Sequence, residues 1–258
     1  MYFKYVKILF KAFLQYRASM WIIILSQFAF SFVPFAAMYL LFEQFGTVEG
    51  WTFGEAAMCF AVIYASFSIT EFYARGFDRF AKQIVAGDFD RILLRPRGTM
   101  LQVFGSEIEF SRVGRLAQSI VALGVAILLL DITWDFFKIT TLIFMIASGV
   151  VIFTGIFILG ATVCFFTIQG LEVLNVLTYG SREMAQYPLS IYNKWIIRFF
   201  TFVIPFGCVN YLPLMYLTGR VEGDDILHML TPLAGMLFIM PCMIVWNYGV
   251  KRYVSTGN

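Results

Sequence analysis

Charged residues and histidine are scarce in this 258-residue sequence. Asp, Glu, Lys and Arg make up 14% of it, against about a quarter in a soluble domain, and His228 is its one histidine. A sequence so poor in titratable side chains does not predict a hydrolytic or metal-dependent catalytic centre. His228 stands at the start of an apolar run, where an interfacial or packing role is expected rather than catalysis.

Cysteine pairs and nucleotide-binding motifs are also missing. The four cysteines (Cys59, Cys164, Cys208 and Cys242) lie far apart in apolar stretches without the spacing of a metal site, so neither a disulfide nor a metal ion is predicted. No G-x-x-x-x-G-K-S or G-x-x-x-x-G-K-T motif occurs, and the lysine-rich segments lack the glycines that surround a phosphate. We therefore expect this chain to bind no cofactor itself and not to be an ATP-hydrolysing enzyme.

What the sequence does have is apolar residues in long runs. Hydrophobic residues make up 60% of it and aromatic residues 19%, and the charged residues gather in a few clusters between the runs. This pattern predicts an all-α polytopic membrane protein with a single transmembrane domain over residues 1–258. Six transmembrane helices are predicted at residues 20–42, 53–74, 113–130, 139–168, 199–217 and 227–248.

Glycine and proline predict irregular packing within these spans. Gly149, Gly155 and Gly160 allow another helix to approach the fourth span closely, although glycine is also simply common in membrane helices. Prolines interrupt the fifth and sixth spans, and each one frees a backbone carbonyl that needs another partner. Bends or broken helices are therefore expected near Pro205, Pro213, Pro232 and Pro241.

Lysine and arginine predict the orientation of the chain. When the N-terminus is placed inside, all but Lys138 and Arg220 of the 19 basic residues fall on the cytoplasmic side. Both termini are therefore expected in the cytoplasm, in a multi-pass protein of the plasma (bacterial inner) membrane. The connection at residues 169–197 is placed on the same side, with Lys194 and Arg198 marking the inner end of the fifth span. Basic residues in these positions face membrane lipids or a protein partner, and no nucleic acid is expected as a partner.

The N-terminal segment, residues 1–18, is predicted to form an amphipathic helix in the membrane interface. Apolar and basic side chains recur there in two neighbouring stripes at helical spacing. One stripe holds Phe3, Val6, Phe10 and Phe13, and the other holds Lys4, Lys7 and Lys11. The helix is either a passive anchor or an elbow that transmits force from a soluble partner into the first span.

The most strongly patterned polar segment is the loop at residues 75–112, between the second and third spans. Tyr73, Phe77, Phe80 and Ile84 share one helical face, so the second span is expected to continue into the cytoplasm as an amphipathic helix. Gly87 is expected to end that helix, because glycine tolerates backbone conformations that other residues avoid.

A short helix is expected after Gly87. Asp88 is suited to cap its N-terminal end, Asp90 favours the same end, and Pro96 stops it. The apolar side chains of the segment are Phe89, Ile92, Leu93 and Leu94. The segment is either a solvated turn with some interfacial anchoring or a docking element for a cytoplasmic subunit, and the second interpretation explains more of the pattern.

Few polar side chains lie inside the predicted spans. Glu71 stands near the inner end of the second span, where it forms either a structural i,i+4 pair with Arg75 or a gating salt bridge. The uncharged polar candidates either line a transport pathway or bond neighbouring helices to each other. They are Gln27, Ser31, Ser66, Ser68 and Thr70.

Three stretches resemble one family of membrane proteins. Residues 84–96 (IVAGDFDRILLRP), 187–192 (YPLSIY) and 199–213 (FFTFVIPFGCVNYLP) are similar to the permease subunits of ABC-2 type exporters, and the resemblance covers nearly the whole chain. It implies a six-span half that pairs with a second permease half, identical or related. Each half is seated on a copy of a separate cytoplasmic ABC ATPase subunit, which binds ATP and Mg.

The resemblance also implies that the loop at residues 75–112 carries the coupling helix that docks on the ATPase. The docking residues would be Gly87, Asp88, Phe89, Asp90, Arg91, Ile92, Leu94, Arg95 and Pro96, with Phe89, Ile92 and Leu94 as the apolar contacts. The transport pathway would lie between the two halves, lined mainly by the first, second and fifth spans. Because the spans hold few charges, an amphipathic or hydrophobic cargo is expected rather than a small ion.

Two other functions stay open. One is the membrane transducer subunit of an ABC-type uptake system, whose short Ala-Arg-Gly element is superficially similar to Ala74, Arg75 and Gly76. A third subunit with its own ligand pocket would indicate that function. The other is a non-transport membrane scaffold or immunity protein, which would protect cells even when the partner ATPase is inactive.

Overall fold

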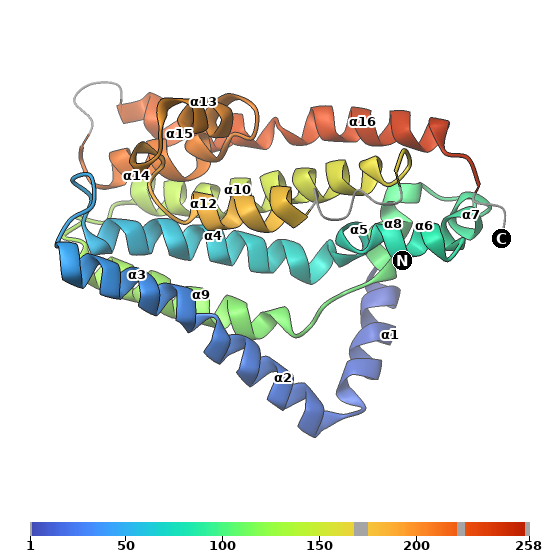
Figure 1. Ribbon diagram of the computed structural model, residues 1–258. Helices are drawn as coiled ribbons and strands as arrows, with labels where there is room; N and C mark the ends of the chain where they lie inside the picture. The colour runs from blue at the N-terminus through green and yellow to red at the C-terminus, as the bar shows by residue number, and fades with distance from the viewer. Residues whose placement is uncertain (1, 168–174, 221–224, 256–258) are drawn as a thin grey trace.

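The computed structural model describes residues 2–167, 175–220 and 225–255, and these residues are arranged as a bundle of helices (Figure 1). Within them, the one β-bridge joins Val48 to Trp51. The all-α prediction is therefore confirmed. Five helical stretches are long and apolar enough to cross a membrane: Arg17–Phe45, Phe53–Tyr73, Arg112–Leu129, Phe136–Val163 and Ile226–Arg252.

These stretches lie close to five of the six predicted spans. The first consists of α2 (Arg17–Phe30) and α3 (Phe32–Phe45), which meet at Ser31. The next three are α4 (Phe53–Tyr73), α9 (Arg112–Leu129) and α10 (Phe136–Val163), and residue 168, the end of the fourth predicted span, lies outside the described residues. The last consists of α15 (Asp225–Met236) and α16 (Ile239–Arg252), so the break expected from its prolines falls at residues 237–238.

The central helix of the bundle is α4, and nearly all of its side chains are buried. Its first turn is fixed by a capping box, in which the Thr52 hydroxyl accepts from the Glu55 backbone and Glu55 Oε2 accepts from the Thr52 backbone at 2.9 Å. A Cβ atom on Gly149 of α10 would lie 2.4 Å from Ser66 Oγ of α4. The close helix approach predicted at Gly149 is therefore confirmed.

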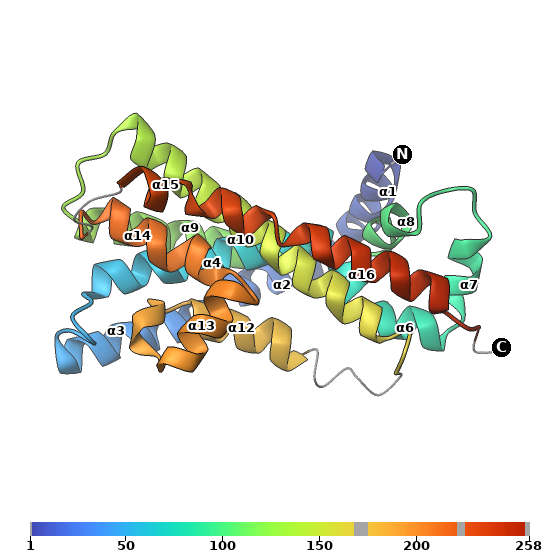
Figure 2. The same ribbon diagram turned by 90° about the horizontal axis from the view of Figure 1, so that it is seen from above.

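The bundle has two ends, which we name after one residue at each (Figures 1 and 2). The Trp51 end holds the turn between α3 and α4 and the start of α10. The Phe89 end holds the N-terminal helix, the last turns of α16 and four short helices. These four are α5 (Arg75–Asp78), α6 (Phe80–Val85), α7 (Asp88–Leu93) and α8 (Thr99–Ser106).

The N-terminal helix, α1 (Tyr2–Leu14), runs across the axis of the bundle at the Phe89 end (Figure 1). Phe10 and Phe13 pack on Phe110, with ring centroids 5.2 and 5.5 Å apart. A helix transverse to the spans is the geometry expected of an interfacial helix. Its insertion into a membrane surface stays a prediction.

The segment predicted as the fifth span does not cross the bundle. It forms α13 (Lys194–Phe202), η3 (Gly207–Tyr211) and α14 (Leu212–Leu217), with a bend of 89° between its two halves. Trp51 Nε1 donates to Ser190 Oγ at 2.7 Å just before the segment, and the guanidinium of Arg220 lies 4.4 Å from the Trp51 ring centroid just after it. The chain therefore leaves the Trp51 end and returns to it, and the prediction of a span at residues 199–217 is wrong.

The crossing lies earlier in the chain, between Phe165 and Ser190. Phe165 packs on Phe80 and Phe89 at one end of the bundle, and Ser190 bonds Trp51 at the other. Between them, and excluding residues 168–174, which are not described, the chain forms η1 (Val176–Gly180), α12 (Ser181–Ala185) and η2 (Leu189–Ile191). This segment runs antiparallel to α4.

For the described end of this connection, the same contacts contradict the prediction that residues 169–197 lie on the same side of the bundle as the loop at residues 75–112. Lys194 begins α13 four residues after Ser190, so Lys194 and Arg198 lie toward the Trp51 end, on the same side as Arg220. Arg182 and Glu183 lower the mean hydropathy of this segment, which conceals the crossing in the sequence, although the two side chains pair with each other in the structure. In the hydropathy pattern, the apolar hairpin that follows (α13, η3 and α14) is read as the fifth span instead.

Candidate docking layer, ion cluster and open cavity

The loop at residues 75–112 forms a compact layer at the Phe89 end, which we call the docking layer (α5 to α8). The predicted helical extension of α4 is interrupted at Ala74 and again at Arg79, so it becomes α5 and α6. Its apolar face is nevertheless the predicted one. Phe77 and Phe80 are buried, and their rings lie 5.2 and 5.3 Å from the ring of Trp246 in α16.

Two backbone features hold the layer together. A Cβ atom on Gly76 of α5 would lie 2.0 Å from the carbonyl oxygen of Val103, so α8 approaches α5 at a distance that only glycine permits. Gln102 Nε2 donates to the carbonyl oxygens of Ile92 and Arg97, each at 3.1 Å. These two hydrogen bonds from Gln102 fix the C-terminal end of α7 and the turn that follows it.

The short helix α7 begins after Gly87, as predicted, but Gly87 itself, with a φ of +69°, is the N-cap, and Asp88 is the first helical residue, so the predicted cap by the Asp88 side chain is wrong. Its apolar side chains divide between inside and outside. Phe89 has 0% exposure and packs on Phe80, Phe165 and Tyr253 at centroid distances of 5.1, 5.2 and 5.0 Å. The side chain of Ile92 is buried as well. Leu93 and Leu94 are 42% and 85% exposed.

The apolar docking contacts expected from the sequence therefore need revision. Phe89 and Ile92 belong to the core of this chain and offer no surface to a partner, whereas Leu94 does. Leu93, which the resemblance did not single out, joins it. Docking by the remaining residues of the set stays a prediction. In a helix of six residues the sequence shows two apolar faces, and it does not tell which one the rest of the chain covers.

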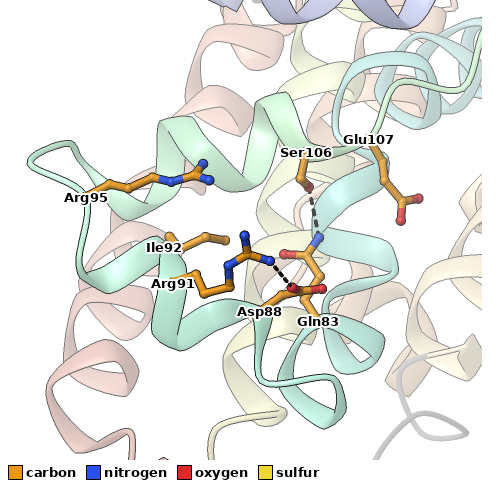
Figure 3. A pocket seen from close by; sticks show the side chains of 7 residues that line it. All are labelled: Gln83, Asp88, Arg91, Ile92, Arg95, Ser106 and Glu107. Atoms are coloured by element: carbon orange, nitrogen blue, oxygen red, sulfur yellow. Dashed lines mark hydrogen bonds and ion pairs between the residues drawn. The ribbon is translucent and has the colours of Figure 1, made fainter. Parts of the chain in front are cut away.

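A recess of about 270 Å³ lies beside α7, between α6 and the end of α8 (Figure 3). Arg91 and Arg95 reach toward it from one side, and Gln83, Asp88 and Glu107 lie opposite. Gln83 Nε2 donates to Ser106 Oγ at 2.9 Å, while Gln83 Oε1 is buried and accepts no hydrogen bond within the described residues. The recess thus offers guanidinium donors and an unfilled acceptor in one place. We call it the α7 recess.

Glu71, in the last turn of α4, is the centre of a buried ion cluster. Its side chain has 0% exposure. The predicted pair with Arg75 is present at 3.2 Å, but Glu71 Oε2 also lies 2.5 Å from Arg115 Nη1 and 3.3 Å from Arg112 Nε. Tyr179 OH donates to Glu71 Oε1 at 3.3 Å. The sequence analysis missed Arg112, Arg115 and Tyr179 as partners of Glu71.

The cluster continues into the docking layer. Arg75 pairs with Asp78, and Arg79 lies 3.1 Å from Glu107 and 3.2 Å from Glu109. Burial raises the pKa of Asp78, and the guanidinium of Arg75 opposes that shift. These pairs connect the membrane part of α4 and α9 with the layer outside it through charged side chains.

A second cavity, of about 340 Å³ and open to the surface, lies between α2, α3, α4, α9 and α12, and we call it the Arg182 cavity. Two of the residues predicted to line a pathway, Gln27 and Ser31, line this cavity. The other residues around it are Phe30, Pro34, Tyr64, Arg115, Arg182 and Glu183.

The remaining pathway candidates have other surroundings. Ser66 and Thr70 are buried and donate to carbonyl oxygens of α10, Ser66 to Ile146 at 3.0 Å and Thr70 to Val150 at 3.2 Å. They therefore bond neighbouring helices, which was the alternative role. Ser68 donates to the carbonyl of Tyr64 at 2.6 Å and borders a separate apolar recess of about 160 Å³.

Other chemistry is not visible in the described part of the chain. No group of three His, Cys, Asp or Glu side chains is placed to hold a metal ion among the described residues. The four cysteines are free, and all but Cys208 are buried. What the described residues do offer is two open cavities and a network of buried ion pairs.

Comparison with known proteins gives one match. The model of a family described as ABC-2 family transporter protein matches residues 12–257. No curated protein and no solved structure matches the chain.

Proposed function

The chain belongs to the ABC-2 transporter family, and on that premise we propose that it is the permease subunit of an ATP-driven exporter. It forms half of a translocation pathway and is coupled to a separate ATPase subunit, which binds the ATP and Mg. The second half is either a second copy of the chain or a related permease.

The observation that carries this proposal is the build of the docking layer. A surface that transmits force from a soluble motor has to be exposed on one face and firmly attached on the other. In α7, Leu93, Leu94 and Arg91 face outward, while Phe89 is enclosed by rings from α6 and the C-terminal segment. Burying an aromatic side chain of this size contributes about 1.5–3 kcal/mol, so α7 and the membrane helices are expected to move as one unit.

Positive charge supports the cytoplasmic placement of this layer. Even with Lys194 and Arg198 reassigned, most basic side chains lie toward the Phe89 end, as the orientation rule requires of the cytoplasmic side. They include Lys7, Lys11, Arg79, Lys82, Arg91, Arg95, Arg97, Lys251 and Arg252.

The exposed apolar face of the first span supports pairing with a second half. Trp21, Ile22, Leu25, Phe30 and Val33 of α2 and α3 are between 57% and 74% exposed. Lipid covers such a face in a membrane, and so does another permease half. A pathway between two halves would then be bordered by the helix that also supplies Gln27 and Ser31.

The test is purification of the tagged chain in mild detergent, with ATPase activity measured on the eluate. The double variant Leu93→Asp, Leu94→Asp is expected to lose at least about tenfold of the recovered activity, because both side chains lie at the proposed contact. Leu101→Asp is the matched control, since Leu101 is a 50% exposed leucine on α8 outside the α7 recess. Phe89→Asp is unsuitable, because it would place a carboxylate in the core.

Recovery of the ATPase with the double variant at the wild-type level would refute the docking surface. A wild-type chain that purifies alone in detergent and in lipid discs would refute the coupling itself and favour a scaffold or immunity protein. A stable third subunit that carries a ligand pocket would instead indicate an uptake transducer.

A further inference from the structure

We propose that the Arg182 cavity binds the anionic head group of an amphipathic molecule whose apolar part lies against the first span. The inference rests on the proposed function only in so far as the molecule is a transported one. The site itself is argued from the side chains that line the cavity.

The cavity is rich in hydrogen-bond donors without partners. Gln27 Oε1 is filled, because it accepts from Arg112 Nη1 at 3.0 Å and from Arg115 Nη2 at 3.2 Å. Gln27 Nε2 donates to no acceptor in the part of the chain that the structure describes. The same holds for Arg115 Nε and for Arg182 Nη1. An incoming ligand therefore meets three donors from two spans and α12.

The acid at the cavity is already engaged. Glu183 accepts from Arg182 through Nε at 3.0 Å and through Nη2, and from Gln186 Nε2 at 3.0 Å. The hydroxyl of Tyr64 lies 3.5 Å from the same carboxylate. A ligand cation would have to compete with these contacts, whereas a ligand anion finds open donors.

The charged side chains at the cavity also favour an anionic ligand. Arg75 is neutralised by Asp78 at the edge of the docking layer, which leaves Glu71 facing both Arg112 and Arg115. The charged residues that line the cavity are two guanidinium groups, Arg115 and Arg182, and one carboxylate, Glu183, whereas the wider ion cluster is balanced because Glu107 and Glu109 pair with Arg79 and Arg75. The side chains of Arg115 and Arg182 are only 14% and 15% exposed, so an anion in the cavity would meet two guanidinium groups that water reaches poorly.

The walls indicate what the anion is attached to. The guanidinium carbon of Arg182 lies 5.0 Å from the ring centroids of both Tyr64 and Phe67, which holds its plane against aromatic surface. Phe30 borders the cavity and is 74% exposed on the side of the first span, and Pro34 follows it one turn later. A ligand with an apolar chain can therefore place its head group at the arginines and its chain along α2 and α3.

The experiment measures binding of radiolabelled palmitate and its methyl ester to the full chain in phosphatidylcholine nanodiscs, with empty nanodiscs as background. The two probes share their apolar chain and differ in charge. We expect palmitate to bind at least about tenfold more tightly than the ester, since a charge-assisted hydrogen bond contributes about 1.5–3 kcal/mol. Equal affinities would overturn the proposal.

Two variants give effects of opposite sign. Arg182→Gln removes a donor and a charge, and it is expected to weaken palmitate binding about tenfold, with partial recovery in Arg182→Lys. Glu183→Gln removes the acid and is expected to strengthen binding. A general loss of structure would weaken both, so weakening in Glu183→Gln would contradict the proposal. Arg198→Gln, outside the cavity, is the control and should bind as wild type.

The source of the ligand is settled by adding phosphatidylglycerol to the nanodiscs. Competition by this lipid would support the site with a phospholipid head group as its occupant. Undiminished palmitate binding would support it with a single-chain amphiphile as the occupant. Neither outcome depends on the ATPase, so a failure here is distinct from a failure of the docking surface.

Discussion

Two regions of this chain are built from short helices, and they are fastened in different ways. The docking layer holds α5 to α8 at the Phe89 end through ion pairs, a glycine contact and enclosed aromatic rings. The hairpin of α13, η3 and α14 lies at the Trp51 end and carries few charges. It is held where it begins and ends by Trp51, through Ser190 and Arg220.

The difference shows what each region is suited to. Ion pairs and rings distribute load over several helices, so the docking layer is suited to pass on a displacement. The hairpin is also packed along its length, since the ring of Phe206 lies 4.9 Å from that of Phe153 and Asn210 Nδ2 donates to the carbonyl oxygen of Ala185 at 2.6 Å, so Trp51 is one of several contacts that hold it. Arg220 also donates from Nε to Glu55 Oε1 at 2.6 Å and from Nη2 to Glu55 Oε2 at 2.7 Å, and these bonds connect the end of the hairpin to the first turn of α4.

The sharpest test of the comparison is the side of the membrane on which each region lies. In a variant without the native cysteines, Lys194→Cys should react with a membrane-impermeant thiol reagent in intact cells, whereas Arg91→Cys should react only after permeabilisation. The expected difference is all or none, because the two exposed side chains lie at opposite ends of the bundle. Lys138→Cys is the control for the outer side. If Lys194→Cys behaved like Arg91→Cys, the re-entrant hairpin would be refuted.

A substitution at Gly76 should destabilise the docking layer. Gly76→Ala places a Cβ atom 2.0 Å from a backbone oxygen, and overpacking of this kind costs about 1–3 kcal/mol or more. We expect a lower midpoint of thermal unfolding, followed by tryptophan fluorescence, together with reduced recovery of the ATPase. Gly98→Ala is the matched control, because a Cβ atom there meets nothing within 4 Å. Equal midpoints for the two variants would show that the α5–α8 contact does not hold the layer.

The hairpin should loosen with a smaller change. Trp51→Phe removes the hydrogen bond to Ser190 and weakens the contact with Arg220, at a cost of about 1–2 kcal/mol. Because this opening is local, it is best followed through alkylation of Cys208, the half-buried thiol in η3, which should accelerate about tenfold. Trp195→Phe is the control, since Trp195 is 77% exposed. An unchanged rate in Trp51→Phe would mean that other contacts hold the hairpin.

The sequence predicted a span correctly where the apolar run is continuous. Residues 53–74, 113–130 and 139–168 read as spans because nothing interrupts them, and α4, α9 and α10 follow closely. Residues 199–217 are equally apolar but only dip into the bundle, because apolarity reports surroundings and not direction. The true crossing carries Arg182 and Glu183, whose charges are satisfied by each other and by aromatic rings, and no sequence pattern announces that.

The candidate site was predictable where its contacts are local. Glu71 and Arg75 are four residues apart on one helix, and the sequence is enough to pair them. Arg112 and Arg115 reach Glu71 from α9, a contact that exists only after α4 and α9 have packed. The same limit applies to α7, where tertiary packing chose Phe89 for the inside and Leu94 for the outside.

Arg115 connects the two proposed sites, because its guanidinium donates to Glu71 through Nη1 and also borders the Arg182 cavity. A ligand that draws on Arg115 therefore competes with Glu71, and Glu71 also holds Arg75 at the edge of the docking layer. If both sites bind as proposed, this shared bonding would couple binding in the cavity to binding at the docking layer. Coupling is reciprocal, so whatever occupancy of the cavity does to the layer, a partner bound to the layer must do to affinity in the cavity by the same factor.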